Sequence, residues 1–207
     1  MKRLGGIAVI VLVLLAGWSP MGTAAPELTL IEDMRTGGLV LYWRHAKTDW
    51  SQSDEDLSDM SDCSRQRNLS EEGRHQAEVV GQALKALDIP VGDVLSSAFC
   101  RNIETAEIAF GRHEVDELLF NAPTARRAGL SADRLVTHLK TLLAEPPADP
   151  GRNTVIVGHN FNLQFAAGLE IDEGEIAVFR PERDAFTHLA TLTPNQLRVA
   201  ARVLRPD

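Results

Sequence analysis

Short apolar runs alternate with longer amphipathic segments along this chain, and that alternation constrains the fold more than any other feature. Three runs of four to six residues are short enough for buried strands: residues 39–43, 91–96 and 154–157. Segments with helical spacing follow them, at residues 70–87, 101–110, 131–144 and 160–169. Parallel strands need helical crossovers. We therefore expect an α/β fold, a three-layer sandwich whose central sheet is mostly parallel and flanked by helices.

Local signals set the ends of several of these segments. Ser70 is a hydroxyl N-cap followed by two acidic residues, which suit the positive end of a helix dipole. Gly111 is typical of a helix C-terminus and closes the segment over residues 101–110. Further short strands are expected at residues 115–119, 176–180 and 185–193, the last two as a hairpin.

The first 24 residues have the order of a secretory signal peptide. A charged start, Lys2-Arg3, precedes an apolar run over residues 7–15, and small residues follow at 22–25. The apolar run is shorter than the roughly 20 residues that span a bilayer. We expect cleavage after Ala24 and export of one mature domain, residues 25–207, to the periplasm or the medium, with no stable membrane span. An uncleaved anchor is the alternative.

The charge of the chain limits its partners. A formal net charge of −8 argues against nucleic-acid binding, which requires a basic face. An acidic protein also repels anions, so a phosphate must be bound by a local cluster of positive groups. Residues 49–62 contain six acidic residues and no basic one, and we interpret this segment as a solvated loop rather than a cation site.

Basic residues follow the three buried strands. Arg44 and His45 end the first strand, Arg101 follows the second, and His159 ends the third. The carboxyl ends of strands in an open α/β sheet form the ligand-binding edge, so these four side chains are expected in one pocket. Arginine binds phosphate in bidentate fashion. A neutral imidazole attacks phosphorus, and a protonated one stabilises charge on the transferring group.

Four segments resemble motifs of the histidine phosphatase superfamily, also called phosphoglycerate mutase-like, and they occur in the family's order. They are residues 41–51 with the Arg-His pair, residues 68–77, residues 96–106 with the second arginine, and residues 155–160 with the second histidine. Together they extend over most of the expected mature chain.

The resemblance implies a role for each residue of the expected pocket. His45 would be the nucleophile that forms a phosphohistidine, Arg44 and Arg101 would bind the phosphate, and His159 would stabilise the transferring group. No metal or organic cofactor is implied. We expect a phosphomonoester hydrolase that acts outside the cytoplasm on a small phosphorylated substrate. The alternative is a non-catalytic phosphate-binding module of the same fold.

The resemblance does not identify the general acid. Asn160 follows the second histidine, where one branch of the family has an aspartate as proton donor. Residues 119–122 contain no acid, although another branch has its glutamate in that stretch. Asp116 and Glu117 lie just before it, and either could serve. Two possibilities remain: a donor in the acidic loop, such as Asp49 or Asp62, or no protein acid at all.

The two cysteines, Cys63 and Cys100, are expected to form a disulfide. Export places the chain in an oxidising compartment, and the number of cysteines is even. Cys100 lies beside Arg101 at a strand end, and Cys63 lies in the loop that leaves the first strand. The bridge would therefore hold the acidic loop near the pocket.

Overall fold

A computed structural model describes residues 24–204, so the expected signal peptide lies outside the described residues except for its last position. Within the described part, no helix is long and apolar enough to cross a membrane. Six strands form one sheet in the order β3-β2-β4-β1-β5-β6. They are β1 (Val40–Arg44), β2 (Val91–Ser96), β3 (Glu114–Val115), β4 (Asn153–Gly158), β5 (Ile176–Glu182) and β6 (Ala185–Leu192).

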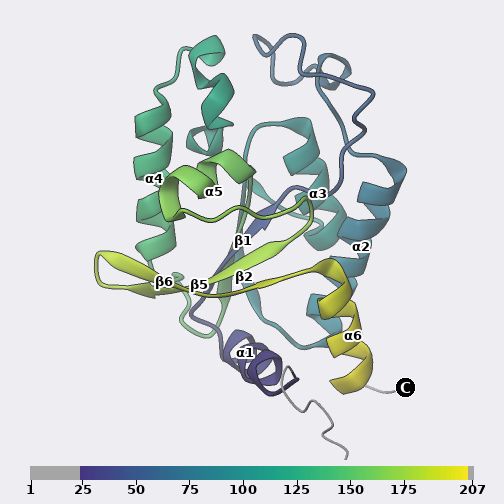
Figure 1. The fold of residues 1–207 in the computed structure, drawn as a ribbon, viewed down its shortest axis with the longest axis vertical. Helices are drawn as coiled ribbons and strands as arrows, with labels where there is room; N and C mark the ends of the chain where they lie inside the picture. Colours follow the sequence, from purple (N-terminus) through teal and green to yellow (C-terminus); the bar gives the residue numbers. More distant parts are fainter. Residues whose placement is uncertain (1–23, 205–207) are drawn as a thin grey trace, which may run out of the picture.

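The strand pairing agrees with the expected topology. The adjacent strands among β1, β2, β3 and β4 run parallel to one another, and β5 and β6 add an antiparallel hairpin beyond β1. The helices are α1 (Ala24–Thr36), α2 (Glu71–Ala86), α3 (Cys100–Phe110), α4 (Ala132–Ala144), α5 (Asn160–Ala167) and α6 (Pro194–Leu204). The expected α/β sandwich with a mostly parallel sheet is thus confirmed (Figure 1).

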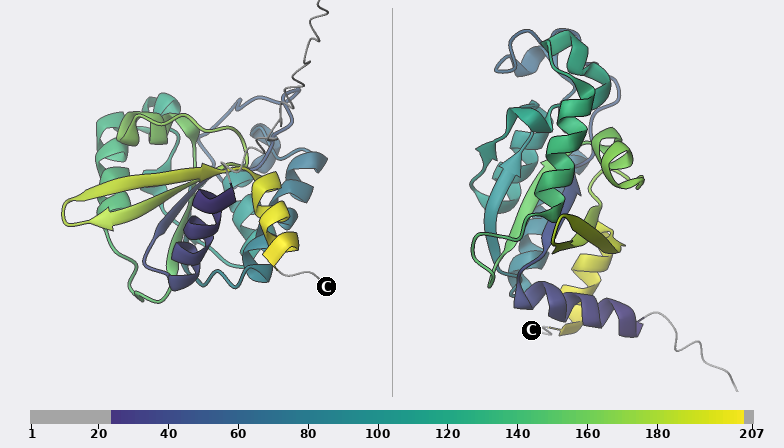
Figure 2. Two further views of the ribbon diagram at one scale, coloured as in Figure 1. Left: turned by 60° about the horizontal axis from the view of Figure 1, so that its bottom comes forward. Right: turned by 90° about the vertical axis from the view of Figure 1, so that its left-hand side faces the viewer.

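Strand alternation divides the core into two layers. Leu41 and Trp43 of β1 face a cluster formed with α1, α2, α3 and α6, whereas Val40 and Tyr42 face the cluster formed with α4 and α5. All four side chains are fully buried. The side views in Figure 2 show helices on both faces of the sheet, which leaves the strand ends as the place where polar residues can gather.

Two helices were not anticipated from the sequence. α1 buries Leu30, Ile31 and Met34, and α6 buries Leu197 and Ala201, against the same face of the sheet. Among the described side chains, α1 and α6 bury fewer residues than α2 does. Short helices are only marginally stable in isolation, and packing against the sheet stabilises these two.

The strand expected over residues 115–119 is largely wrong. β3 ends at Val115, and the 3₁₀ turn η2 (Glu117–Leu119) follows directly. The Asp116 carboxylate accepts a hydrogen bond from the backbone N–H of Leu118, at 2.9 Å. Such a side chain offers the backbone a turn in place of a ladder, and this ends the strand.

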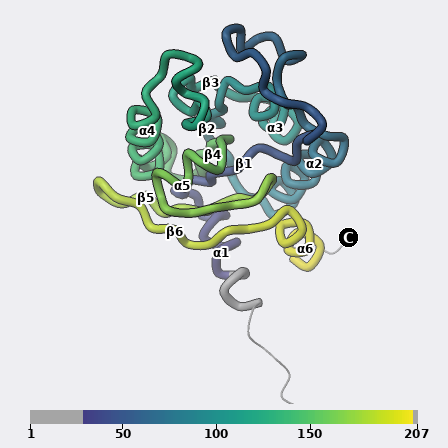
Figure 3. The backbone as a smooth tube through the Cα atoms, turned by 45° about the horizontal axis from the view of Figure 1, so that its top comes forward, coloured from purple at the N-terminus to yellow at the C-terminus, as the bar shows by residue number. Residues whose placement is uncertain are grey.

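The expected disulfide is present. Cys63, in the 3₁₀ turn η1 (Cys63–Arg65), is bonded to Cys100 at the start of α3, with 5.7 Å between the Cα atoms. Figure 3 shows the segment between β1 and α2 passing beside α3 at the carboxyl end of the parallel strands. The bridge therefore attaches this loop directly to the residue that precedes Arg101.

Candidate active site

His45 lies just beyond β1 with only 3% of its surface exposed. Its backbone N–H donates to the carbonyl of Gly158, which holds the ends of β1 and β4 together. The ring Nδ1 lies 2.9 Å from the carbonyl oxygen of Ala46. A carbonyl only accepts, so Nδ1 carries the proton and Nε2 keeps a free lone pair. Burial, and then the charge of Arg101, holds the pKa of His45 well below its usual value, so the ring is neutral.

His159 faces His45 across the end of the sheet. The two ring centroids lie 5.6 Å apart. The hydroxyl of Tyr42 donates to the carbonyl of His159 and accepts from its N–H, each at 2.9 Å, which fixes the backbone. Gly158 permits this contact, because a Cβ there would lie 2.1 Å from the Tyr42 hydroxyl oxygen. The residue before the second histidine therefore has to be glycine.

The ring of His159 is neutral in this pocket. Burial, followed by the charge of Arg101, lowers its pKa well below the usual value. Its Nε2 lies 2.9 Å from the hydroxyl oxygen of Ser97. Charge stabilisation by a protonated imidazole, which the sequence analysis considered, would require a bound dianion to raise the pKa of His159.

Arg101 is the most enclosed charged group of the site, with 1% of its surface exposed. Its guanidinium lies over the ring of Phe99, 4.3 Å from the centroid. Nη1 donates to a carboxylate oxygen of Asp54 at 3.0 Å and to the backbone carbonyl of Arg67 at 3.3 Å. The first turn of α3 thus presents this arginine towards both histidines, as the sequence predicts.

Arg44 lies at the end of β1, beside His45. Its Nη1 donates to the carbonyl of Ile171 at 2.8 Å, and its Nη2 lies 3.7 Å from a carboxylate oxygen of Glu173. These contacts hold one edge of the guanidinium and leave Nε buried without a hydrogen-bond partner among the described residues. The structure thus brings together all four residues that the sequence assigned to the pocket.

A third arginine, Arg67, was missed by sequence reasoning. It belongs to the loop between β1 and α2 rather than to a strand end, and an isolated backbone bridge between Thr48 and Leu69 carries it towards His45. Its guanidinium lies 3.8 Å above the ring of Trp50, whose surface is 69% exposed. The only signal in the sequence was its place beside the motif at residues 68–77.

The three arginines retain unused donors. Nε of Arg44, Nη1 of Arg67 and Nε of Arg101 are buried and have no hydrogen-bond partner within residues 24–204. An unsatisfied buried donor costs about 1–3 kcal/mol, and more when it is charged. An anion with several acceptor oxygens would satisfy all three groups, so the pocket is suited to phosphate. No cluster of histidine, cysteine and acidic side chains suited to a metal occurs among the described residues.

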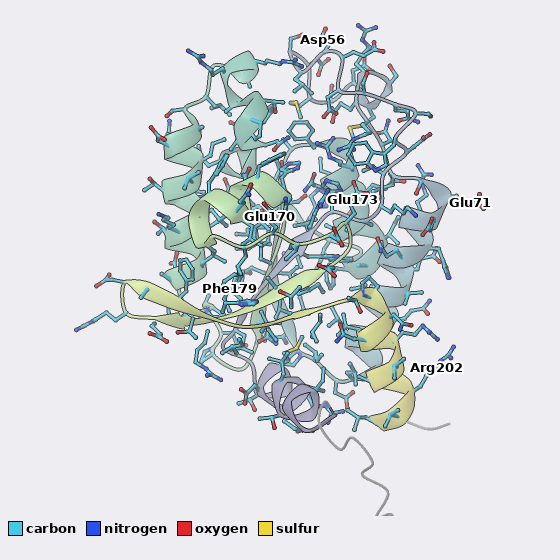
Figure 4. All side chains as sticks on the ribbon, viewed as in Figure 1. Asp56, Glu71, Glu170, Glu173, Phe179 and Arg202 are labelled. Atoms are coloured by element: carbon cyan, nitrogen blue, oxygen red, sulfur yellow. A yellow bond between two sulfur atoms is a disulfide. The ribbon has the colours of Figure 1, made fainter. Side chains whose placement is uncertain are left out.

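Two carboxylates balance this positive charge, and neither was singled out from the sequence. Glu173 lies in the loop before β5 and accepts hydrogen bonds from the hydroxyl and the N–H of Thr48, at 2.7 and 3.2 Å. Asp54 comes from the acidic loop and pairs with Arg101. Figure 4 shows Glu173 near the centre of the molecule, whereas Asp56 of the same acidic loop lies at its outer edge.

The two acids that sequence reasoning offered as proton donors lie elsewhere. Asp116 pairs with His138, 2.6 Å from its Nε2. Glu117 has an exposed side chain in η2. Neither has a described contact with the two histidines or the three arginines, so neither is supported as the donor.

Comparison with protein families agrees with the motif analysis. Residues 40–121 match the histidine phosphatase superfamily (branch 1). This segment contains His45, Arg67 and Arg101, whereas His159 lies beyond it. No curated protein matches the sequence.

Solved structures share the fold at low sequence identity. The protein histidine phosphatase SixA, complexed with tungstate, is 17% identical, with 77% of this chain and 99% of that chain covered and a TM-score of 0.54. The product of open reading frame Rv3214 of Mycobacterium tuberculosis is 20% identical, with 76% and 98% covered and a TM-score of 0.54. A phosphoserine phosphatase variant from Entamoeba histolytica, in complex with phosphoserine, is 14% identical, with 77% and 98% covered and a TM-score of 0.52. Residues 40–121 thus match the histidine phosphatase superfamily (branch 1), and the described chain has the fold of these solved structures.

Proposed function

We propose that this protein is a phosphomonoester hydrolase that acts outside the cytoplasm through a phosphohistidine at His45. The observation that carries the proposal is the pairing of a neutral imidazole with unused arginine donors. Nε2 of His45 has a free lone pair, and Arg44, Arg67 and Arg101 each keep one buried donor without a partner. A candidate nucleophile thus lies beside a set of donors that suit an anion.

The reaction proceeds in two steps. The arginines hold the phosphoryl oxygens while Nε2 of His45 attacks phosphorus, and the bond from phosphorus to the leaving oxygen breaks. Water then attacks the phosphohistidine and releases inorganic phosphate. Fixed cationic donors stabilise the charge of both transition states without reorganisation. The Nδ1–H of His45 keeps donating to the Ala46 carbonyl oxygen, so the ring keeps its orientation throughout.

The substrate is proposed to be a small phosphorylated molecule. A hollow of about 420 Å³ adjoins Arg44 and is lined by Trp50, Lys47 and Glu173 among others. Its size is within the range of small-molecule sites. One structural neighbour binds phosphoserine, a small phosphorylated molecule, although at 14% identity that protein establishes only the fold.

The proposed location rests on the N-terminal leader and on the disulfide. Disulfides persist in oxidising compartments and are rare in the cytosol. The bridge between Cys63 and Cys100 adjoins the proposed site, so the loop that carries Arg67 and Asp54 would depend on that environment. Export is tested by N-terminal sequencing of the processed chain, which should begin at Ala25.

Turnover of a panel of phosphomonoesters by the purified mature protein tests the activity. An aryl phosphate with a good leaving group should release phosphate, and an alkaline quench should trap an acid-labile phosphoenzyme. The competing function is a phosphate-binding module of the same fold. Phosphate binding with neither turnover nor an adduct would favour that function instead.

A further inference from the structure

The proposed hydrolysis lacks a proton donor for the leaving oxygen, and the acidic loop supplies one residue with the required contacts. Asp54 lies in this loop between β1 and α2, with its side chain 16% exposed. One carboxylate oxygen, Oδ1, accepts from Nη1 of Arg101 and from the N–H of Arg67, each at 3.0 Å. Asp54 thus shares Arg101 with the expected phosphate.

The second oxygen of Asp54 is unused. No described residue donates a hydrogen bond to Oδ2, whereas both donors to this side chain are directed at Oδ1. Held through Oδ1, the carboxyl group keeps Oδ2 available for a bound substrate. Based on this geometry, we propose that Asp54 is the general acid of the reaction, an inference that rests on the proposed hydrolase function.

Glu173, the other carboxylate paired with the arginines, is held by further contacts, and so are most acids of the loop. Both oxygens of Glu173 accept hydrogen bonds from Thr48, so this residue acts as a fixed counter-charge for Arg44 and Arg67. Four further acids of the loop each accept from the serine two residues later: Asp49, Asp56, Asp59 and Asp62. Those side chains shape exposed turns and have no described contact with the three arginines.

Three cationic groups face Asp54. They are Arg101 from α3, Arg67 from its own loop, and Arg127, whose Nη1 donates to the Asp54 carbonyl at 3.4 Å. A phosphate dianion bound at Arg101 would neutralise part of the charge of that guanidinium and place negative charge beside Asp54.

The proton balance follows from this arrangement. As the bond from Nε2 of His45 to phosphorus forms, the bond from phosphorus to the leaving oxygen breaks, and the Oδ2 proton of Asp54 passes to that oxygen. The alcohol leaves, and Asp54 is then a carboxylate. It accepts a proton from the water that attacks the phosphohistidine, which restores the acid and releases phosphate.

The surrounding structure fixes the position of the loop. Leu57 is buried in a small cluster with Phe99 and Phe120, directly beside Arg101. The side chain of Gln66 accepts from the N–H of Cys100 at 3.0 Å, and the disulfide joins the loop to the same residue. These contacts hold the loop around Asp54 in a fixed position, as general acid catalysis requires.

The test compares leaving groups in two variants of the mature protein. In Asp54→Asn, the amide oxygen still accepts from Arg101 and Arg67, but no proton is available for transfer. We expect kcat/KM for an alkyl phosphate to fall by about 10²–10⁴-fold, and for an aryl phosphate with a good leaving group by less than about tenfold. The alkaline limb of the pH profile should disappear for the alkyl substrate. Asp56→Asn, in the same loop, is the matched control and should leave both rates unchanged.

Equal losses on both substrates would overturn the proposal, because Asp54 would then serve only to hold Arg101. An unchanged alkyl rate would overturn it as well. Wild-type protein that hydrolyses neither substrate and forms no adduct would overturn the proposed function, and the role of Asp54 with it. That outcome is distinguishable because it appears before any substitution is made.

Discussion

The site is built from two regions of different character: the carboxyl edge of the parallel strands and the loop between β1 and α2. The strand edge supplies His45 and His159, whose backbones are fixed by neighbouring strands and by Tyr42. The loop supplies Arg67 and Asp54, which are held by side-chain contacts and one disulfide. In the proposed mechanism the strand edge carries the covalent chemistry, whereas the loop adjusts charge and supplies protons.

Removal of the nucleophile at the strand edge should have the largest effect on turnover. His45→Ala is expected to lower turnover by at least about 10³-fold and to abolish the acid-labile adduct, since a lost nucleophile removes the covalent route entirely. The fold should persist in circular dichroism, because His45 is a pocket residue rather than part of an apolar cluster. His75→Ala, at an exposed position of α2, is the control. Near-full activity in His45→Ala would show that the mechanism is wrong.

Removal of the disulfide should show how much it contributes to stability and to the position of the loop. Closing a loop over a sequence separation of 37 residues contributes about 4 kcal/mol in the chain-entropy model. We expect Cys63→Ser with Cys100→Ser to lower the free energy of unfolding by up to that amount in urea titrations. The alkyl phosphate rate should fall more than the aryl rate, since Asp54 loses its fixed position. An equal fall in both rates would mean that the bridge supports Arg101 rather than the donor.

Arg67 tests whether the loop also binds the phosphate. Its buried Nη1 has no hydrogen-bond partner among the described residues, and a hydrogen bond to a charged group contributes about 1.5–3 kcal/mol. Arg67→Ala should therefore lower kcat/KM by about 10–100-fold for aryl and alkyl phosphates alike. Arg65→Ala is the matched control, because Arg65 lies in the same loop with an exposed side chain paired to Glu55. A loss with Arg65→Ala of the same size would assign the effect to general surface charge.

The two regions also differ in how far the sequence predicts them. Strand ends are visible as short apolar runs, and the edge rule then places Arg44, His45 and His159 together without any structure. The residue before the second histidine, Gly158, is explained only by the structure, since the sequence does not show that Tyr42 fills the space of a side chain there.

The functional residues of the loop are not marked by any comparable pattern in the sequence. Asp54 is one of six acids in residues 49–62, and the sequence does not distinguish it from its neighbours. Its role depends on a contact with Arg101, 47 residues away along the chain. Glu173 likewise reaches Thr48 across 125 residues. The expected strand at 115–119 failed for a local reason instead, because the Asp116 carboxylate accepts a hydrogen bond from the N–H of Leu118 and favours a turn.

The smallest expected effect is on the pH dependence of stability, which involves the two histidines of the strand edge. Burial and Arg101 lower the pKa values of His45 and His159 below those of the unfolded chain. Between the unfolded value near 6.5 and the lower folded values, the unfolded chain binds more protons, so stability is lost as the pH falls through this window. The slope is at most about 1.4 kcal/mol per pH unit for each histidine. Urea titrations between pH 7.5 and 5.5 should show a shallower dependence for His45→Gln than for wild type, whereas His75→Gln should keep the wild-type slope. An unchanged slope in His45→Gln would mean that this ring is not held neutral, and the strand edge would then lack its free nucleophile at mildly acidic pH.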